Sequence, residues 1–324
     1  MRLLRVELSR FFSRRAVAML LLAAALLTAL VAGTTIWGTR PVDAAEQARA
    51  EARVQAITSS PEYKRDLANC QESPEDLFGP GADAADCRRL LAPSTADVVG
   101  RVPLALADEV DDSGIAVIVI VTVLMIVAGT TFAGADWASG SMSNQMLFEP
   151  RRQRVWWAKA GAALVGTGVA AAVLIAAFWV ALYLVADARG IGTGAAVQTD
   201  IRWMVARGVS LAALAGFGGY ALTMLLRHTV GTLAVLFVYA AGGEALISLL
   251  PVERSGQYSP AENVFAWIRD GGRVFDSSID CPVSSAGCDQ TFQLTLLHGG
   301  AYLAVLVLLV TVVSAVLFQR RDIP

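Results

Sequence analysis

The sequence predicts an all-α integral membrane protein with six transmembrane helices. Only 17% of the residues are charged and 55% are hydrophobic, whereas about a quarter of a typical soluble domain is charged. Six uncharged runs are each long enough to cross a bilayer core as a helix, which takes about 20 residues. Acidic residues gather in the loops at one end of these runs and arginines lie at the other end, an asymmetry typical of membrane proteins.

The six predicted spans contain a single Asp, Glu, Lys or Arg residue, Glu244. Five arginines precede the first run, so it resembles a signal peptide, but it is longer than the 7 to 15 apolar residues of a cleaved signal. We therefore interpret it as a retained span, with cleavage as the alternative. The predicted spans are 16–37, 114–134, 160–186, 208–226, 229–250 and 294–318.

The distribution of charge predicts that both termini lie in the cytoplasm of a cell membrane. Alternating the loops puts 12 basic residues and four acids on one side and 23 acids on the other, and basic residues are retained inside. The inner segments are an amphipathic helix over 1–15, a loop over 135–159, the turn between the fourth and fifth spans, and the tail 319–324. The outer segments are 38–113, 187–207 and 251–293.

The four cysteines all fall on the predicted outer side, where disulfides persist. Because each pair is close in sequence, we expect Cys70 to bond with Cys87 and Cys281 with Cys288. Four cysteines allow three pairings, and free cysteines are the alternative.

The outer segments are predicted to be mostly helical. Residues 42–57 are rich in Ala, Glu, Gln and Arg, which favour helices, and prolines at 61, 74, 80, 93 and 103 divide the remainder into short pieces. Ser259, Pro260 and Glu262 form a capping-box pattern that predicts a short helix at the outer membrane surface.

Several kinds of chemistry lack their sequence pattern in this chain. There is no G-x-x-x-x-G-K-[ST] phosphate loop, so we expect no ATPase activity from the chain itself. With only His228 and His298, the H-E-x-x-H zinc motif is impossible, and G-x-S-x-G is absent. A serine protease that uses His298 is a minor alternative to a histidine at a helix interface. We predict no catalytic residue, no metal, no bound cofactor and no nucleic-acid surface.

The most distinctive segment is the inner loop over 135–159. Ala138, Met142 and Met146 are spaced by four, which predicts a short amphipathic helix over 137–147 that ends before Pro150. Basic residues and tryptophans follow, and we expect the basic side chains to reach the lipid headgroups and the tryptophans to anchor the third span. The alternative interpretation is that the whole segment is only such an inner interface anchor. These residues are Arg151, Arg152, Arg154, Lys159, Trp156 and Trp157.

This loop resembles the coupling region of the type-2 ATP-binding-cassette exporter permeases. The matching positions are Asp136, Gly140-Ser141, Pro150-Arg151-Arg152 and Lys159, although the family usually has Glu at the first position and Gly-Thr at the second. The turn over 225–229 with Tyr239 and Glu244 resembles the family's inner turn and fifth span. The arginine-rich first 15 residues are similar to its N-terminal interface helix.

The resemblance implies a permease subunit that exports an apolar or amphipathic substrate. Its inner helix would dock on a separate ATPase subunit that holds ATP and Mg, and a second permease chain, identical or related, would complete the pathway in the lipid bilayer. The implied coupling residues are Asp136, Trp137, Gly140, Ser141, Met142, Met146, Pro150 and Arg151. A non-transporting scaffold or sensor partner is the alternative, and a secondary transporter is disfavoured because only one acid lies in the spans.

Glu244 is a candidate functional residue because an ionisable group inside a span is costly to bury. The fourth and fifth spans form a hairpin, and counting back from its turn places Arg207 about 6 Å from Glu244 along the axis. We therefore predict an ion pair between Arg207 and Glu244 that locks the hairpin.

Overall fold

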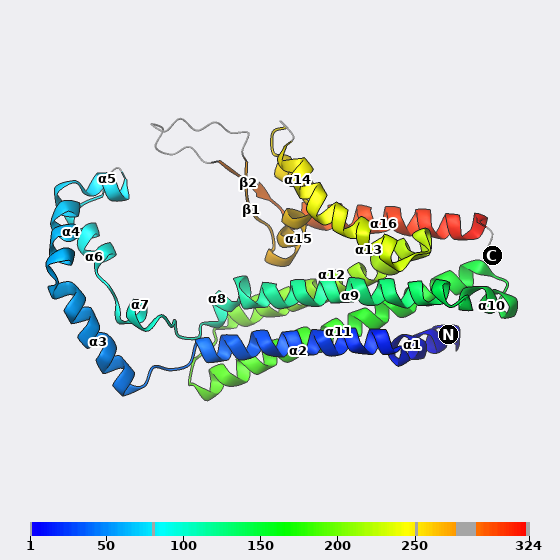
Figure 1. The fold of residues 1–324 in the computed structure, drawn as a ribbon, viewed down its shortest axis with the longest axis horizontal. Helices are drawn as coiled ribbons and strands as arrows, with labels where there is room; N and C mark the ends of the chain where they lie inside the picture. Colours follow the sequence, from blue (N-terminus) through cyan, green and yellow to red (C-terminus); the bar gives the residue numbers. More distant parts are fainter. Residues whose placement is uncertain (1, 80–81, 250–251, 277–289, 322–324) are drawn as a thin grey trace. The chain divides into compact units, whose positions relative to one another are not determined.

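The structure is a computed structural model, and it describes residues 2–79, 82–249, 252–276 and 290–321. The chain divides into two compact units (Figure 1). The bundle unit comprises Met1–Gly33, Leu106–Cys281 and Asp289–Pro324, and the second unit comprises Thr34–Ala105 and Pro282–Cys288. Each unit is described by itself.

The described residues contain six helical stretches that are long and apolar enough to cross a membrane, which confirms the predicted number. They are Arg15–Gly38, Leu106–Ala138, Arg152–Ala188, Ala195–Leu226, Thr229–Ile247 and Leu296–Arg320. The helices of the bundle unit are α1 (Arg2–Ser13), α2 (Arg15–Gly38), α8 (Leu106–Asp111), α9 (Ser113–Ala138), α10 (Ser141–Phe148), α11 (Arg152–Ala188), α12 (Ala195–Leu226), α13 (Thr229–Phe237), α14 (Gly243–Ser248), α15 (Pro260–Arg269) and α16 (Leu296–Arg320).

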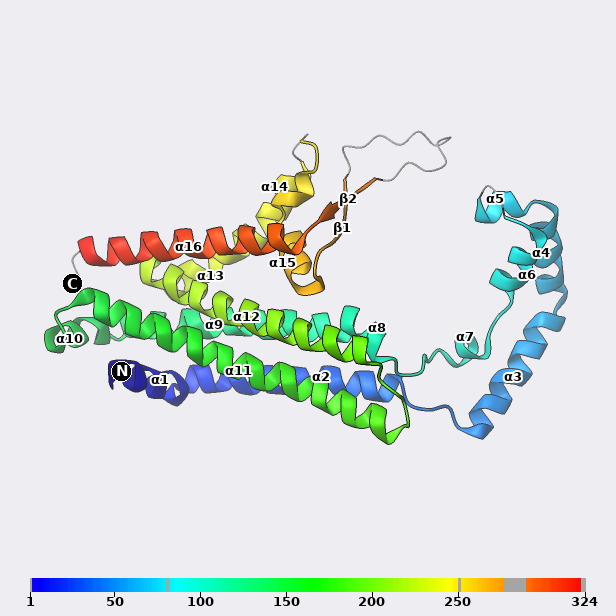
Figure 2. The same ribbon diagram turned by 180° about the vertical axis from the view of Figure 1, so that it is seen from behind.

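Small residues allow the central helices to approach closely. A Cβ atom on Gly129 of α9 would lie 1.9 Å from the backbone oxygen of Gly216 on α12, so these two backbones are in direct contact. On the other side of the unit, α1 runs along α11 (Figure 2), where the ring of Phe11 occupies the space that a side chain at Gly166 would need. Because glycine has no side chain, the helices can contact each other directly at these positions.

The fourth span begins earlier than its hydrophobicity indicates. Helix α12 starts at Ala195, so most of the predicted loop over 187–207 is helical. The apolar run over 208–226 marks only the part of the helix that is free of charge, while the preceding turns carry polar residues such as Gln198 and Arg202. The fifth span contains a π-helical turn at Val238–Gly242, between α13 and α14.

The structure agrees with the all-α prediction and adds one small element of two strands. Strands β1 (Gly272–Phe275) and β2 (Thr291–Leu294) pair antiparallel, with Gly272 opposite Leu294. They follow a 3₁₀ turn at Ser255–Tyr258 and the short helix α15, which starts as its sequence predicts, with the Ser259 hydroxyl accepting a hydrogen bond from the Glu262 amide. Strand β2 then leads directly into α16.

The second unit consists of short helices separated by proline and serine. The first of them, Ala44–Ser59, coincides closely with the run of helix formers, and Pro61 and Pro74 each stand at the first position of the next helix. Its helices are α3 (Ala44–Ser59), α4 (Pro61–Glu72), α5 (Pro74–Phe78), α6 (Ala84–Leu91) and α7 (Thr95–Val99).

Candidate functional site

Four charged side chains meet inside the bundle unit, near the end that carries α10. The ammonium group of Lys159 donates hydrogen bonds to the Glu7 carboxylate at 2.9 Å and to the Asp136 carboxylate at 2.5 Å. The guanidinium of Arg14 forms a second ion pair with Asp136. We call Glu7, Arg14, Asp136 and Lys159 the ion cluster. Glu7, Asp136 and Lys159 are buried, so the cluster belongs to the interior.

Three helices that are far apart in the sequence supply the ion cluster. Glu7 comes from α1, Asp136 from the last turn of α9 and Lys159 from the second turn of α11, while Arg14 lies between α1 and α2. Within the cluster two carboxylates face two cations, so formal charge balances there, and the half-exposed Arg10 adds a further ion pair to Glu7 at 3.3 Å. Such balance is required, since an unpaired buried charge is strongly destabilising.

An aromatic ring covers the cations of the cluster. The Arg14 guanidinium lies 5.2 Å and the Lys159 ammonium 5.4 Å from the centre of the Phe132 ring. The ring of Phe11 packs on Phe132 at 5.2 Å. Cation–π contacts strengthen when water is excluded, so these rings both stabilise the charges and seal them from solvent.

Helix α10 is attached to the ion cluster by two side chains. The Ser141 hydroxyl donates to Asp136 at 2.7 Å, and the Gln145 amide donates to Glu7 at 2.7 Å. Gly140 precedes the helix with φ of 67°, a left-handed conformation that favours glycine. The sharp turn at Gly140 and these two hydrogen bonds hold α10 against the ends of α1 and α9.

The predicted amphipathic helix over 137–147 is wrong in its start, and the structure shows which of its side chains are buried. Trp137 belongs to the last turn of α9, and α10 begins at Ser141. Met142 is buried in the core and Met146 packs against it, so neither is a free contact surface. The exposed apolar residues of α10 are instead Leu147 and Phe148, which are 81% and 90% exposed.

Lys159 was expected at the lipid headgroups, and this prediction is also wrong. Its side chain is fully buried in the ion cluster because it follows Trp156 by three residues and therefore lies on the same, inward face of α11. Arg151 is exposed before the start of that helix, and Pro150 follows the end of α10. Among the implied coupling residues, the structure thus brings Asp136 and Ser141 together and leaves Pro150 and Arg151 at the surface.

The remaining side of this end is closed by Trp137 and α16. The Arg227 guanidinium lies 4.8 Å from the centre of the Trp137 ring, and the Phe318 ring contacts the same indole at 6.4 Å. Burial lowers the pKa of Arg227, and the nearby Arg321 and Arg152 lower it further. The guanidinium groups of Arg152, Arg227 and Arg321 therefore lie near one another at this end of the bundle unit.

The predicted ion pair between Arg207 and Glu244 does not form. Arg207 pairs with Asp270 at 3.3 Å, and the indole of Trp267 donates to the Arg207 carbonyl at 3.1 Å, so α15 packs where the fifth span was expected. Two straight, adjacent helices would have brought Arg207 to Glu244, but α15 supplies the contacts of Arg207 instead.

Glu244 instead caps α15. Its carboxylate accepts hydrogen bonds from the Ser259 hydroxyl at 2.8 Å and from the Ala261 amide at 2.7 Å. A carboxylate at a helix N-terminus accepts hydrogen bonds from the free amides there, and its negative charge interacts favourably with the positive end of the helix dipole. Desolvation and then the Glu244 charge raise the pKa of the neighbouring Glu262, against the opposing effect of Arg269.

The Cys70–Cys87 disulfide is confirmed and joins α4 to α6, with the two Cα atoms 5.9 Å apart. Cys281 and Cys288 lie outside the described residues, so their bond stays a prediction.

Sequence reasoning missed Glu7, Arg14, Gln145, Leu147 and Phe148. A signal for the first was present, because Leu4, Glu7 and Phe11 share one helical stripe at spacings of three and four. An acid on an otherwise apolar stripe indicates a buried partner. No comparable pattern identifies the other four residues.

Comparison with known proteins supplies no family for this chain: no family model, curated protein or solved structure matches it.

Proposed function

We propose that this chain is the permease subunit of an ATP-driven exporter, and that α10 receives force from a separate ATPase subunit. The observation that carries the proposal is the attachment of α10: one short helix is bonded to Asp136 at the end of one span and to Glu7 beside another, and both acids bind Lys159. A displacement of α10 would therefore move α1, α9 and α11 together. Rigid-body shifts of packed elements are a common way of transmitting such changes.

The exposed end of α10 is suited to contact another protein. Leu147 and Phe148 project from a helix whose other side is held by the core, and exposed aromatic and aliphatic side chains are typical anchors of protein interfaces. The neighbouring Arg151 and Arg154 are also exposed and would steer an acidic partner surface toward these anchors.

The ATPase is proposed as a separate chain because the sequence has no phosphate loop. The resemblance of the segment around α10 to exporter permeases supports the same assignment. A second permease chain is part of the proposal, since six spans of one chain supply half of a pathway between two subunits. The apolar spans suit an apolar or amphipathic substrate, moved from a cytoplasmic α10 end to the outside of the cell membrane.

The test is purification of the full chain from its native membrane, followed by identification of bound proteins that carry a phosphate loop. We expect Phe148→Asp and Leu147→Asp to release such an ATPase, because a charge would be buried at the interface. Asn144→Asp is the matched control, since it adds the same charge to an exposed polar position of α10.

Reconstitution separates this proposal from a scaffold or sensor role. The permease should change the ATP hydrolysis rate of the bound ATPase, and Phe148→Asp should abolish that change. If an ATPase stays bound to Phe148→Asp as firmly as to the control, or if no phosphate-loop protein is found, the proposal fails.

A further inference from the structure

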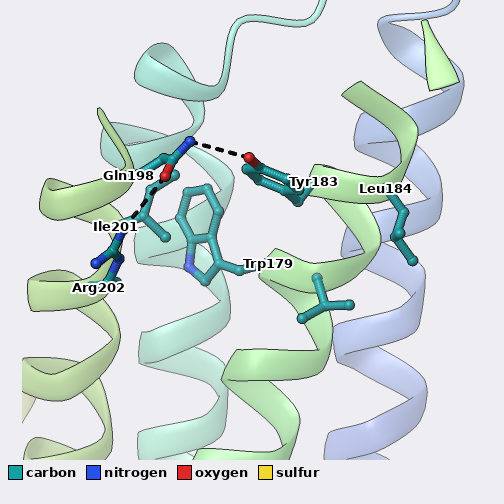
Figure 3. A pocket seen from close by; sticks show the side chains of 7 residues that line it. Trp179, Tyr183, Leu184, Gln198, Ile201 and Arg202 are labelled. Atoms are coloured by element: carbon teal, nitrogen blue, oxygen red, sulfur yellow. Dashed lines mark hydrogen bonds between the residues drawn. The ribbon is translucent and has the colours of Figure 1, made fainter. Parts of the chain in front are cut away.

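A groove of about 240 Å³ lies between α11 and α12, at the end of the bundle unit opposite to α10 (Figure 3). Its apolar wall comes from Val180 and Leu184 of α11, and its polar wall comes from Gln198 and Arg202 of α12. Trp179 lies between the two walls. The groove therefore has one side suited to hydrocarbon and one side suited to an acceptor group.

Arg202 in this groove has no acidic partner among the described residues. Its one hydrogen bond runs to the Gln198 side-chain oxygen at 3.4 Å, and the Gln198 amide in turn donates to the Tyr183 hydroxyl at 3.1 Å. Gln198 is thus level with Tyr183, and Arg202 lies one helical turn, about 5 to 6 Å, deeper along the bundle. At that depth α11 still carries apolar side chains.

A second donor in the groove, the indole N–H of Trp179, is unused. Trp179 is only 5% exposed, and its indole N–H has no hydrogen-bond partner within the described part of the chain. Figure 3 shows this indole beside Ile201, with its nitrogen on the side of Arg202. A buried N–H without a partner is unfavourable. This nitrogen is covered in the structure, so an acceptor next to Arg202 would satisfy both donors once the indole turns slightly toward the groove.

We propose that the groove binds one acidic phospholipid of the surrounding bilayer. The lipid phosphate would accept hydrogen bonds from Arg202 and Trp179, while an acyl chain would lie along Val180 and Leu184. Arginine matches phosphate in geometry and charge, and tryptophan with tyrosine is typical of the headgroup level of a membrane. This inference requires only that the chain spans a membrane and is independent of the proposed transport function.

The test is a lipid titration of the full chain in mild detergent, with bound lipids counted by native mass spectrometry. Both lipids carry the phosphodiester, but phosphatidylglycerol should bind about tenfold more tightly than phosphatidylcholine with the same acyl chains, because the choline ammonium would lie near the Arg202 guanidinium and be repelled by it. Arg202→Gln should remove this preference. Trp179→Phe keeps the ring but loses the N–H and should weaken phosphatidylglycerol binding by about fivefold.

Arg154→Gln is the matched control, since it removes an exposed arginine near the other end of α11 and should leave the preference intact. Equal affinity of the wild-type chain for the two lipids, or an unchanged preference in Arg202→Gln, would overturn the proposal. Displacement of the lipid by millimolar inorganic phosphate would assign the groove to a soluble anion and overturn it as well.

Discussion

Lys159 connects the two acids of the ion cluster, and its neighbours explain why a lysine can be buried there. Lys159 contacts one oxygen of each carboxylate, and other donors hold the second oxygen: Gln145 on Glu7, and Arg14 with Ser141 on Asp136. Every charge in the cluster thus has a partner of opposite sign. Removing one member leaves an excess of one sign in a buried site.

We expect Lys159→Met to lower the free energy of unfolding by about 3 to 5 kcal/mol, because two buried carboxylates would lose the fully buried cation between them and keep only Arg14 and the half-exposed Arg10. The measurement is the midpoint of thermal unfolding of the full chain in detergent. Arg154→Gln is the control, as its side chain is exposed on the same helix. Equal midpoints for the two variants would show that the cluster does not stabilise the bundle.

The contacts of Arg207 lead to a second prediction, tested by double-mutant cycles on thermal unfolding. We expect a coupling of about 0.2 to 1 kcal/mol between Arg207→Gln and Asp270→Asn, a small value because Asp270 is 63% exposed and screened by solvent. Arg207→Gln and Glu244→Gln should be additive, since their side chains bind different partners. Coupling of Arg207 to Glu244 without coupling of Arg207 to Asp270 would contradict the structure and support the ion pair predicted from the sequence.

At the scale of elements, the contact between α9 and α12 determines how closely the spans of the bundle unit pack. Gly129 and Gly216 let the backbones touch, and a further close approach places Gly219 of α12 against the Ile126 carbonyl of α9. The ion cluster lies beyond this contact, toward the end of α9. Its geometry therefore depends on the packing of these two helices.

Gly129→Ala should destabilise the bundle unit, because the added methyl would lie 1.9 Å from the Gly216 oxygen and would force the helices apart. We expect a loss of about 1 to 3 kcal/mol, typical of an overpacked core. Gly218→Ala is the matched control, since nothing lies within 4 Å of its added methyl. If both variants unfold at the same temperature, the close contact of α9 with α12 is contradicted.

At the scale of the molecule, both termini of the described chain and α10 share one end of the bundle unit (Figure 2). Arg152 donates to the carbonyl oxygens of Gln319 and Arg321, and Arg321 donates to the Leu225 carbonyl. These basic side chains collect at the α10 end, which is the end predicted from the charge distribution to lie in the cytoplasm. The confirmed disulfide in the second unit agrees with an oxidising compartment for that unit.

This arrangement predicts opposite labelling of two introduced cysteines. In a chain with Cys281 and Cys288 replaced by serine, a membrane-impermeant maleimide added to intact cells should label Ala196→Cys but not Asn144→Cys, although both positions are exposed. Permeabilised cells should label both, which controls for reactivity. Labelling of Asn144→Cys in intact cells would reverse the predicted orientation and remove α10 from the cytoplasm.

The sequence predicted the parts of the structure that depend on neighbouring residues. Six uncharged runs became six apolar helices, because crossing a bilayer requires contiguous hydrophobic residues. Pro61 and Pro74 begin helices, since proline is favoured at the first helical position. Cys70 and Cys87 pair across a short stretch of chain, for which proximity in sequence is informative.

Only the tertiary structure decided which charges meet. Lys159 binds Glu7 across 152 positions, and Arg14 binds Asp136 across 122; no local pattern specifies such partners. Hydropathy reports whether a residue can enter a membrane, whereas an ion pair depends on how helices pack and on which face each one turns inward. The same reason explains the error over Arg207. Counting along two helices predicted Glu244 as its partner, whereas Asp270 is brought to it by the packing of a third helix, α15.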